Sequence, residues 1–448
     1  MRQSHLLFLL MLCAKGTVSA QEPAPHIVLF FVDDLGWMDV GFRNDRLHTP
    51  NIDRLRASGL SFERAYIPTP TCSPSRASLL TGKEAARMQF YRHIPNTTKH
   101  GFTPEGRTTE AFSNWPGDPV QLPTRNWLPL EEVTYAEKLK AHGYYNMFVG
   151  KWHLGHEPYH PIHQGFDRQF GTGNQGHPGS YLAPFFRHGN PLPEATEGEY
   201  LTGVLTDESV RFITEYDRSG PFMLSHWYYT VHGPHIGRPD LVERYTREGM
   251  SGKYAEYAAM VTALDESVGR ILKAVDDKGI TDNTAIIFIS DQGGYFDNAP
   301  LSGGKTGGDA LGEGGARVPL IISYPGVTTP GTRTSVPVQS IDIYPTLLEM
   351  ATGKSFRGEN VQGVSLLPLL RGEKMKPRKL YFFRSYEDQR SAVIEGDWKL
   401  KRYHSGTYEL FNLREDLVEE NNRYADSPQV AKKLRRALQR WEEQVGVR

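Results

Sequence analysis

Two uninterrupted apolar runs that each end in aspartate constrain the fold of this chain most strongly. HIVLFFVDD occupies residues 26–34, and TAIIFISD occupies residues 284–291. A short apolar run that ends in charge is typical of a central β-strand that is buried on both faces of a sheet. Because ligands bind beyond the carboxyl ends of strands in open α/β sheets, both runs predict a functional site at those ends.

Helical patterns separate the strand-like runs, which indicates an α/β fold. Thr49 and Pro50 form a helix start, as N-cap and first helical residue, and Gly59 ends that helix. We expect further helices at residues 134–142, 201–216, 253–278 and 341–351. We expect a strand that passes into a loop over residues 144–155, and further strands at residues 221–230 and 319–324.

The last part of the chain has a different pattern. With 448 residues, the chain is long enough for one large domain and a smaller one. A basic stretch with Pro and Gly around residues 370–377 predicts the boundary, so the large domain covers residues 21–370 and the smaller α+β subdomain residues 371–448. Alternating runs predict antiparallel strands, followed by a helix. They lie at residues 380–386, 390–403 and 407–413, and the helix at residues 429–441.

Residues 1–20 are predicted to be a signal peptide for export. Arg2 precedes an apolar core at residues 6–14, and Val18, Ser19 and Ala20 fit a cleavage site after Ala20. The apolar core is too short to span a membrane, and no later stretch is apolar enough. We therefore expect a secreted or periplasmic protein without a membrane span.

The overall charge is balanced, with 51 Lys and Arg against 52 Asp and Glu, a net charge of −1. This balance gives no reason to expect nucleic acid or an anionic membrane as a partner. Binding of an anionic substrate would therefore depend on local charge.

Cys72 is the only cysteine that remains once Cys13 is removed with the signal peptide, so no internal disulfide is expected. Pro74 suits the first turn of a helix, which places Cys72 at a helix N-terminus, where negative charge is favoured. A free cysteine is often only a small buried side chain. The neighbouring Ser73, Ser75, Arg76 and Ser78 are too polar for a core segment.

Cys72 lies in the stretch TCSPSRASLLTGK, with the pattern Cys-x-Pro-x-Arg. This stretch resembles the signature of the type I sulfatases, which depend on formylglycine. The blocks DDLGW, GKWHLG and DQGG and a glycine-rich block around Lys305 are also similar to that family and stand in its order. The resemblance implies the alkaline-phosphatase-like fold, an α/β/α sandwich around a large mixed β-sheet with a smaller C-terminal antiparallel sheet plus helix. It also implies that a formylglycine-generating or anaerobic maturation enzyme converts Cys72 to formylglycine.

The resemblance further implies a metal site. It assigns the metal to Asp33, Asp34 and Asp291, to a hydroxyl of the modified Cys72, and to Gln292. The family more often has Asn or His at the last position, and the longer Gln292 leaves its role as a ligand open. Oxygen donors without thiolate or histidine favour a hard cation, Ca²⁺ before Mg²⁺.

Four further residues receive roles from the resemblance. Arg76 orients the nucleophile, Lys151 and Lys305 contact the sulfate, and His153 supports the formylglycine. Lys151 and His153 are two positions apart, so their side chains share a face if the backbone there is extended.

A histidine at the end of the strand predicted at residues 221–230 completes the predicted site. We favour His232 as the acid or sulfate ligand, and His235 is the competing choice. The mechanism implied by the resemblance begins with attack on sulfur by one hydroxyl of the formylglycine hydrate. The alcohol then leaves with help from His232 or Lys305, and a proton transfer towards His153 expels sulfate.

The sequence therefore predicts a sulfatase that hydrolyses sulfate monoesters, and we expect a sulfated carbohydrate or polysaccharide as substrate. Within enzymes, the alternative is a phosphonate monoester or phosphodiester hydrolase of the same superfamily. Outside enzymes, it is an inactive relative that binds sulfated glycans. We expect the loops at residues 89–129 and 171–200, together with the C-terminal subdomain, to determine which substrate binds.

Overall fold

The computed structural model describes residues 24–115, 122–189, 191–192, 195–305, 309–386 and 388–447. The signal peptide predicted at residues 1–20 lies outside the described residues. Within them, no helix is both long enough and apolar enough to cross a membrane.

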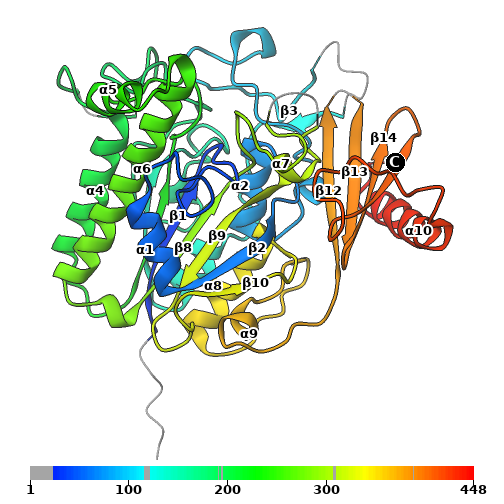
Figure 1. The fold of residues 1–448 in the computed structure, drawn as a ribbon. Helices are drawn as coiled ribbons and strands as arrows, with labels where there is room; N and C mark the ends of the chain where they lie inside the picture. Colours follow the sequence, from blue (N-terminus) through cyan, green and yellow to red (C-terminus); the bar gives the residue numbers. More distant parts are fainter. Residues whose placement is uncertain are drawn as a thin grey trace, which may run out of the picture.

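A large mixed sheet forms the centre of the molecule (Figure 1). Its strands follow the order β10-β2-β9-β8-β1-β7-β5-β6, and β11 also pairs with β2. β1 is parallel to both of its neighbours, β7 and β8, whereas β9 runs antiparallel to β8 and β2. The bounds are β1 (His26–Val32), β2 (Leu60–Tyr66), β5 (Tyr145–Gly150), β6 (Arg168–Phe170), β7 (Phe222–Trp227), β8 (Thr284–Ser290), β9 (Arg317–Ser323), β10 (Thr332–Thr334) and β11 (Val338–Gln339).

Each face of this sheet packs against its own hydrophobic core. Along β1, Val28 and Phe30 belong to one core, and Ile27 and Leu29 belong to the other. All four side chains are fully buried. The unbroken apolar run at the start of the chain therefore follows from burial on both faces of the sheet.

Helices cover both faces of the sheet, as Figure 1 shows. The first core includes residues of α1 (Pro50–Ser58), α4 (Leu201–Glu215), α5 (Pro239–Arg247) and α6 (Gly252–Asp277). The second includes residues of α2 (Cys72–Thr81), α3 (Tyr135–Ala141), α8 (Ile343–Thr352) and α9 (Leu367–Leu370). The short α7 (Glu313–Ala316) leads into β9, and single 3₁₀ turns lie at Ala85–Met88, Thr98–His100, Pro161–His163, Thr281–Asn283 and Ser340–Asp342. This arrangement confirms the expected α/β/α sandwich.

Two details differ from the sequence-based expectation. β7 ends at Trp227 rather than at residue 230. Tyr228 donates one further backbone hydrogen bond to Phe31, and the chain then turns, so that Thr230 and Val231 form backbone hydrogen bonds with Asp33. The segment at residues 89–129 is not simply a surface loop. It contains the ribbon of β3 (Phe112–Ser113) and β4 (Thr124–Arg125), and buried side chains such as Phe90. Irregular spacing of such apolar residues gives no periodic signal, so tertiary packing alone reveals their burial.

The C-terminal sheet has four strands in the order β12-β13-β14-β15, which confirms the antiparallel prediction. They are β12 (Lys379–Tyr386), β13 (Gln389–Glu395), β14 (Trp398–Tyr403) and β15 (Tyr408–Asn412), followed by α10 (Pro428–Gln444). One face of this sheet packs against α10, and the other packs against Tyr66, Leu311 and Ala316 of the large domain. The boundary at residues 370 and 371 stays a prediction.

α1 begins with a cap that comes from another helix. Thr49 occupies the N-cap position, but its hydroxyl donates to Asp53 at 3.0 Å and makes no capping bond. Asp265 of α6 accepts from the backbone N–H groups of Asn51 at 2.9 Å and Ile52 at 2.8 Å instead. A carboxylate at this helix end also interacts favourably with the helix dipole. The predicted start of the helix is correct, but Thr49 does not cap it.

We expect the substitution Asp265→Ala to lower the free energy of unfolding by about 1–2 kcal/mol, because it leaves two N–H groups at the helix end unpaired. Urea denaturation followed by circular dichroism measures the change. Asp277→Ala, at the exposed end of the same helix, is the control and is expected to have little effect. Equal losses for the two variants would contradict the capping role of Asp265.

Candidate active site

Three aspartates gather where two neighbouring parallel strands end. Asp33 and Asp34 follow β1, and Asp291 follows β8. Val32 of β1 lies opposite Ser290 of β8, so the carboxylates meet at the same edge of the sheet. All three are fully buried, and the backbone N–H of Asp34 donates to Asp291 Oδ1 at 3.1 Å. This juxtaposition is the one that the two apolar runs predict.

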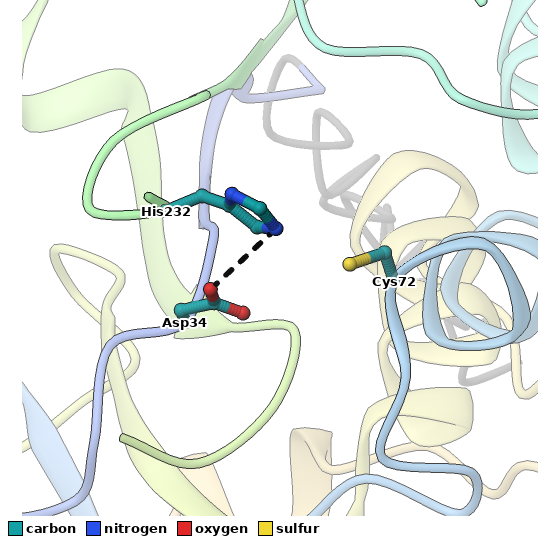
Figure 2. A group of neighbouring side chains, drawn as sticks. All are labelled: Asp34, Cys72 and His232. Carbon is teal, nitrogen blue, oxygen red and sulfur yellow. Dashed lines mark ion pairs between the residues drawn. The ribbon is translucent and has the colours of Figure 1, made fainter. Parts of the chain in front are cut away.

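Cys72 is the first residue of α2 and faces these carboxylates, as Figure 2 shows for Asp34. Its Sγ lies 3.8 Å from Asp33 Oδ1 and 3.3 Å from Gln292 Nε2. Burial raises the pKa of the Cys72 thiol, with the nearby aspartates acting in the same direction. The unmodified thiol is therefore protonated at neutral pH and is a poor nucleophile.

Two fully buried cations lie against Asp33 and Asp291. Arg76 donates to Asp291 Oδ2 at 3.0 Å and to the backbone oxygen of Lys151 at 2.7 Å. Lys151 Nζ lies 2.5 Å from Asp33 Oδ2. Burial alone would raise the pKa of Asp33, but Lys151 and the other nearby cations outweigh it and hold that pKa well below its usual value. The pKa of Asp291 is instead raised, by burial and by the charge of Asp33.

Lys305 supplies a third cation, which forms an ion pair with Asp34. Burial would lower the pKa of Lys305, but the charge of Asp34 more than compensates and raises it. Lys305 therefore stays positively charged at the edge of the carboxylate cluster. The chain as a whole is nearly neutral, so binding of an anionic substrate depends on local positive charge of this kind.

The structure separates the two candidate histidines. His232 points towards Asp34, with 3.9 Å between Nε2 and Oδ2 (Figure 2). Its Nδ1 donates to the Gly233 carbonyl at 2.6 Å, which leaves Nε2 to face the site. Burial lowers the pKa of His232 to about 4, with Lys305 acting in the same direction. His235 packs against aromatic rings instead, with its ring centroid 4.6 Å from that of Tyr295.

His153 reaches the site by a different route from the one expected. Its backbone has a φ of 55°, in the left-handed region, so the chain is not extended here. The prediction that His153 and Lys151 share a face is therefore wrong. His153 Nε2 donates to the carbonyl of Ile94 at 3.0 Å. Its Nδ1 is buried without a partner among the described residues. Burial, with help from the charge of Lys151, lowers the pKa of His153 strongly, so the ring is neutral.

The family model described as Sulfatase matches residues 25–354, well over half of the chain. This chain is a member of the sulfatase family. A second family model, described as N-sulphoglucosamine sulphohydrolase, C-terminal, matches residues 310–444. Together with the relatives below, these matches confirm the predicted family and make the chain a sulfuric ester hydrolase.

Relatives of this sulfatase cover most of its length. N-acetylgalactosamine-6-sulfatase of Mus musculus is 33% identical over 416 residues, which cover 87% of this chain and 74% of the relative. A sulfatase of Formosa agariphila is 30% identical, with 97% of this chain and 92% of the relative covered. The crystal structure of Ps i-CgsB in complex with k-i-k-neocarrahexaose has a TM-score of 0.78 and 27% identity, covering 93% of this chain and 92% of that chain.

A cavity of about 540 Å³ gives access to Cys72 in the sulfatase. The residues that also line it include His153, His232, Gln292 and Lys305. Lys151 pairs with Asp33 and is not among the lining residues. Sequence reasoning did not single out several further lining residues, which are Arg92, His93, Trp115, His177 and Arg384. Most of them lie in the two loops expected to determine the substrate. Arg384 lies on β12, where a regular strand pattern carries no signal of a site.

The donor set of the sulfatase fits a hard cation. One ligand atom each from Asp33, Cys72 and Asp291 lie within 4.8 Å of one another, and most of these donors are carboxylate oxygens. Gln292 Nε2 donates to Asp34 Oδ1 at 2.7 Å. The two ends of an amide side chain have the same shape, so a half-turn about its last bond brings the oxygen into this position. Gln292 therefore has the reach that a metal ligand at this position needs.

Proposed function

We propose that this sulfatase hydrolyses sulfate monoesters of carbohydrates, with a formylglycine made from Cys72 as nucleophile and Ca²⁺ as metal. The observation that carries this proposal is the position of Cys72 in the cavity. Its Sγ faces Asp33 and Gln292, and Lys305 and His232 line the same cavity. A nucleophile, oxygen ligands and cationic donors thus converge on a single space, which is what transfer of an anionic group requires.

Each group has a role that its position supports. Asp33, Asp34, Asp291 and Gln292 would hold the cation, which would lower the pKa of a bound hydroxyl and neutralise sulfate oxygens. Formylglycine at position 72 would supply, as its hydrate, one hydroxyl for attack on sulfur and a second for restoring the aldehyde.

The side chains around these groups bind and orient them. Lys305 binds the sulfate oxygens from the cavity with its ammonium group. His232 lines the same cavity through Nε2, and either Lys305 or a His232 that has taken up a proton beside the bound sulfate protonates the departing alcohol. Arg76 and Lys151 orient Asp291 and Asp33. His153 Nδ1 has no partner among the described residues and lines the same cavity as position 72, so it can accept a proton there.

The relatives support a carbohydrate substrate. The mouse relative is named for a sulfated amino sugar, and the structural neighbour binds a neocarrahexaose. The cavity of about 540 Å³ is large enough for a sugar residue that carries the sulfate. Trp115 supplies an aromatic ring in its wall, with the Arg92 guanidinium 4.2 Å from the ring centroid.

Turnover of matched aryl esters tests this proposal. We expect the purified enzyme to cleave an aryl sulfate at least about 100-fold faster than the corresponding phosphonate monoester or phosphodiester, and then to cleave members of a panel of sulfated sugars. Faster cleavage of the phosphorus esters would instead support the alternative hydrolase. Retained glycan binding without any turnover would support the inactive binding relative.

Removal of the metal is expected to abolish activity. After dialysis against a chelator, kcat/KM should fall by about 100-fold or more, because the cation no longer balances the developing charge. Ca²⁺ should restore activity more fully than Mg²⁺, since a flexible carboxylate site suits the larger ion. Full activity in the chelated enzyme, with its metal content checked by mass spectrometry, would contradict the metal assignment.

We also propose that the chain is exported and modified by a separate maturation enzyme. The pattern of residues 1–20 supports export to the periplasm or the medium. The raised pKa of the Cys72 thiol supports the need for modification, because the thiol itself is a poor nucleophile.

A further inference from the structure

Buried charges link the C-terminal sheet to the large domain. Lys399 and Lys401 of β14 meet Glu313 and Glu419, and each of the four residues is at most 9% exposed. Desolvation makes such a cluster expensive, and well-packed apolar residues would often be at least as stable in its place. We therefore expect these charges to have a role other than stabilising the fold, such as holding a neighbouring segment in position.

Glu419 is the member with the most informative contacts. Its Oε2 accepts from the hydroxyl of Ser302 and from the backbone N–H of Glu313, the latter at 2.7 Å. Its Oε1 lies 3.1 Å from Lys399 Nζ and 3.7 Å from Lys401 Nζ. The residue has a φ of 56°, a left-handed conformation that is uncommon for a glutamate. A single carboxylate thus joins two residues that stand eleven positions apart in the sequence.

Ser302 and Glu313 stand on either side of Lys305 in the sequence. Between them, Lys401 pairs with Asp309 at 2.8 Å, and the backbone N–H of Lys305 donates to Gly294 at 3.0 Å. The sequence around Lys305 is rich in glycine, so it has few side chains of its own to fix its backbone. Lys401 and Glu419 of the C-terminal part of the chain add to this restraint.

We infer that Glu419 is a positioning residue, which holds the backbone on both sides of Lys305 so that the ammonium group stays at Asp34 and in the cavity. This inference rests on the proposed role of Lys305 in binding sulfate. Glu419 is not among the described residues that line the cavity. It acts through Ser302 and Glu313, which stand three positions before and eight positions after Lys305. A displacement of about 1 Å at a charge-stabilising group is enough to lower a rate about 100-fold.

A double-mutant cycle between Glu419 and Lys305 tests the inference. Glu419→Ala should lower kcat/KM for an aryl sulfate by about tenfold to 100-fold. In the Lys305→Ala background the same change should have almost no further effect, because the ammonium group to be positioned is gone. An equal factor in both backgrounds would overturn the inference, since it would mean that Glu419 acts independently of Lys305.

Milder variants keep the test valid if Glu419→Ala folds poorly. Glu419→Gln keeps an acceptor oxygen for Ser302 and Glu313 and should retain most of kcat/KM. Ser302→Ala removes only the contact on one side of Lys305 and should lower kcat/KM about threefold to tenfold. Glu420→Ala, at the exposed neighbouring position, is the matched control and should behave as the unaltered enzyme. Unchanged kinetics in both Glu419→Ala and Ser302→Ala would overturn the inference.

Binding of inorganic sulfate separates this inference from the proposed function. Calorimetry on the full chain should show weaker sulfate binding in Glu419→Ala, by about the same factor as kcat/KM, and no added loss in the double variant. This result would support positioning even if the enzyme turned over no sulfate ester. An active enzyme whose sulfate affinity is unaffected by Glu419→Ala would overturn the positioning role and leave the proposed function intact.

Discussion

Replacement of Cys72 by alanine is expected to reduce the turnover of sulfate esters by a factor on the order of 10⁴ or more, because it removes the precursor of the nucleophile. The side chain is small and lies at the cavity, so the variant should keep its fold. Initial rates with an aryl sulfate measure the loss, and the unfolding midpoint checks the fold.

The peptide that contains residue 72 supplies the chemical control for this prediction. We expect mass spectrometry with an aldehyde-trapping reagent to find formylglycine at position 72 in protein from a secreting host. An active enzyme with only an unmodified thiol, produced in a host that modifies a control sulfatase, would contradict the proposed nucleophile. Activity that survives Cys72→Ala would contradict it more directly.

Replacement of Arg76 by alanine is expected to lower the free energy of unfolding of the metal-free protein by about 3–5 kcal/mol. Arg76 is fully buried between Asp291 and Asp33, at 3.0 Å and 3.5 Å. Its removal leaves the buried Asp33 carboxylate with less compensating charge and takes away the hydrogen-bond donor of Asp291. This cost exceeds that of losing an exposed ion pair. Urea denaturation in the presence of a chelator measures the change.

Calcium provides a second test of the Arg76 prediction. If Asp33 and Asp291 bind the cation, added Ca²⁺ should stabilise Arg76→Ala and recover part of the loss, since a bound ion neutralises the same carboxylates. Arg247→Ala is the control, because its side chain is 72% exposed and pairs only loosely with Glu243. An Arg76→Ala variant as stable as the control would show that the buried ion pairs do not hold this site together.

The parts of the site that depend on strand ends could be predicted from the sequence. Asp33 and Asp291 each follow an apolar run, and parallel pairing of β1 and β8 is enough to bring them together. Pro74 correctly predicts a helix start at Cys72. The polar residues around Cys72 are misleading, because the residues that seem too polar for a core segment are all fully buried: Ser73, Ser75, Arg76 and Ser78. These inferences need only local patterns and one general rule on α/β sheets.

The rest of the site depends on contacts that have no local signal. Arg384 reaches the cavity from the C-terminal sheet, and the backbone turn at His153 changes the direction of a side chain that an extended chain would have placed beside Lys151. The cap of α1 shows the same limit, because Asp265 is distant in the sequence from the helix that it caps. Such features follow from tertiary packing rather than from propensity or spacing.

The central position of β1 also has a consequence for how the chain is made. Its partners β7 and β8 follow it by about 200 and 250 residues, because His26 pairs with Thr284 and Ile27 with Met223. At about 5–20 residues per second, a ribosome needs on the order of 10–50 s to complete both partners. During that time HIVLFFV is an unpaired strand with strong β-propensity, and the charges of Asp33 and Asp34 lie only at its end. We expect the nascent chain to need a chaperone until synthesis of β8 is complete.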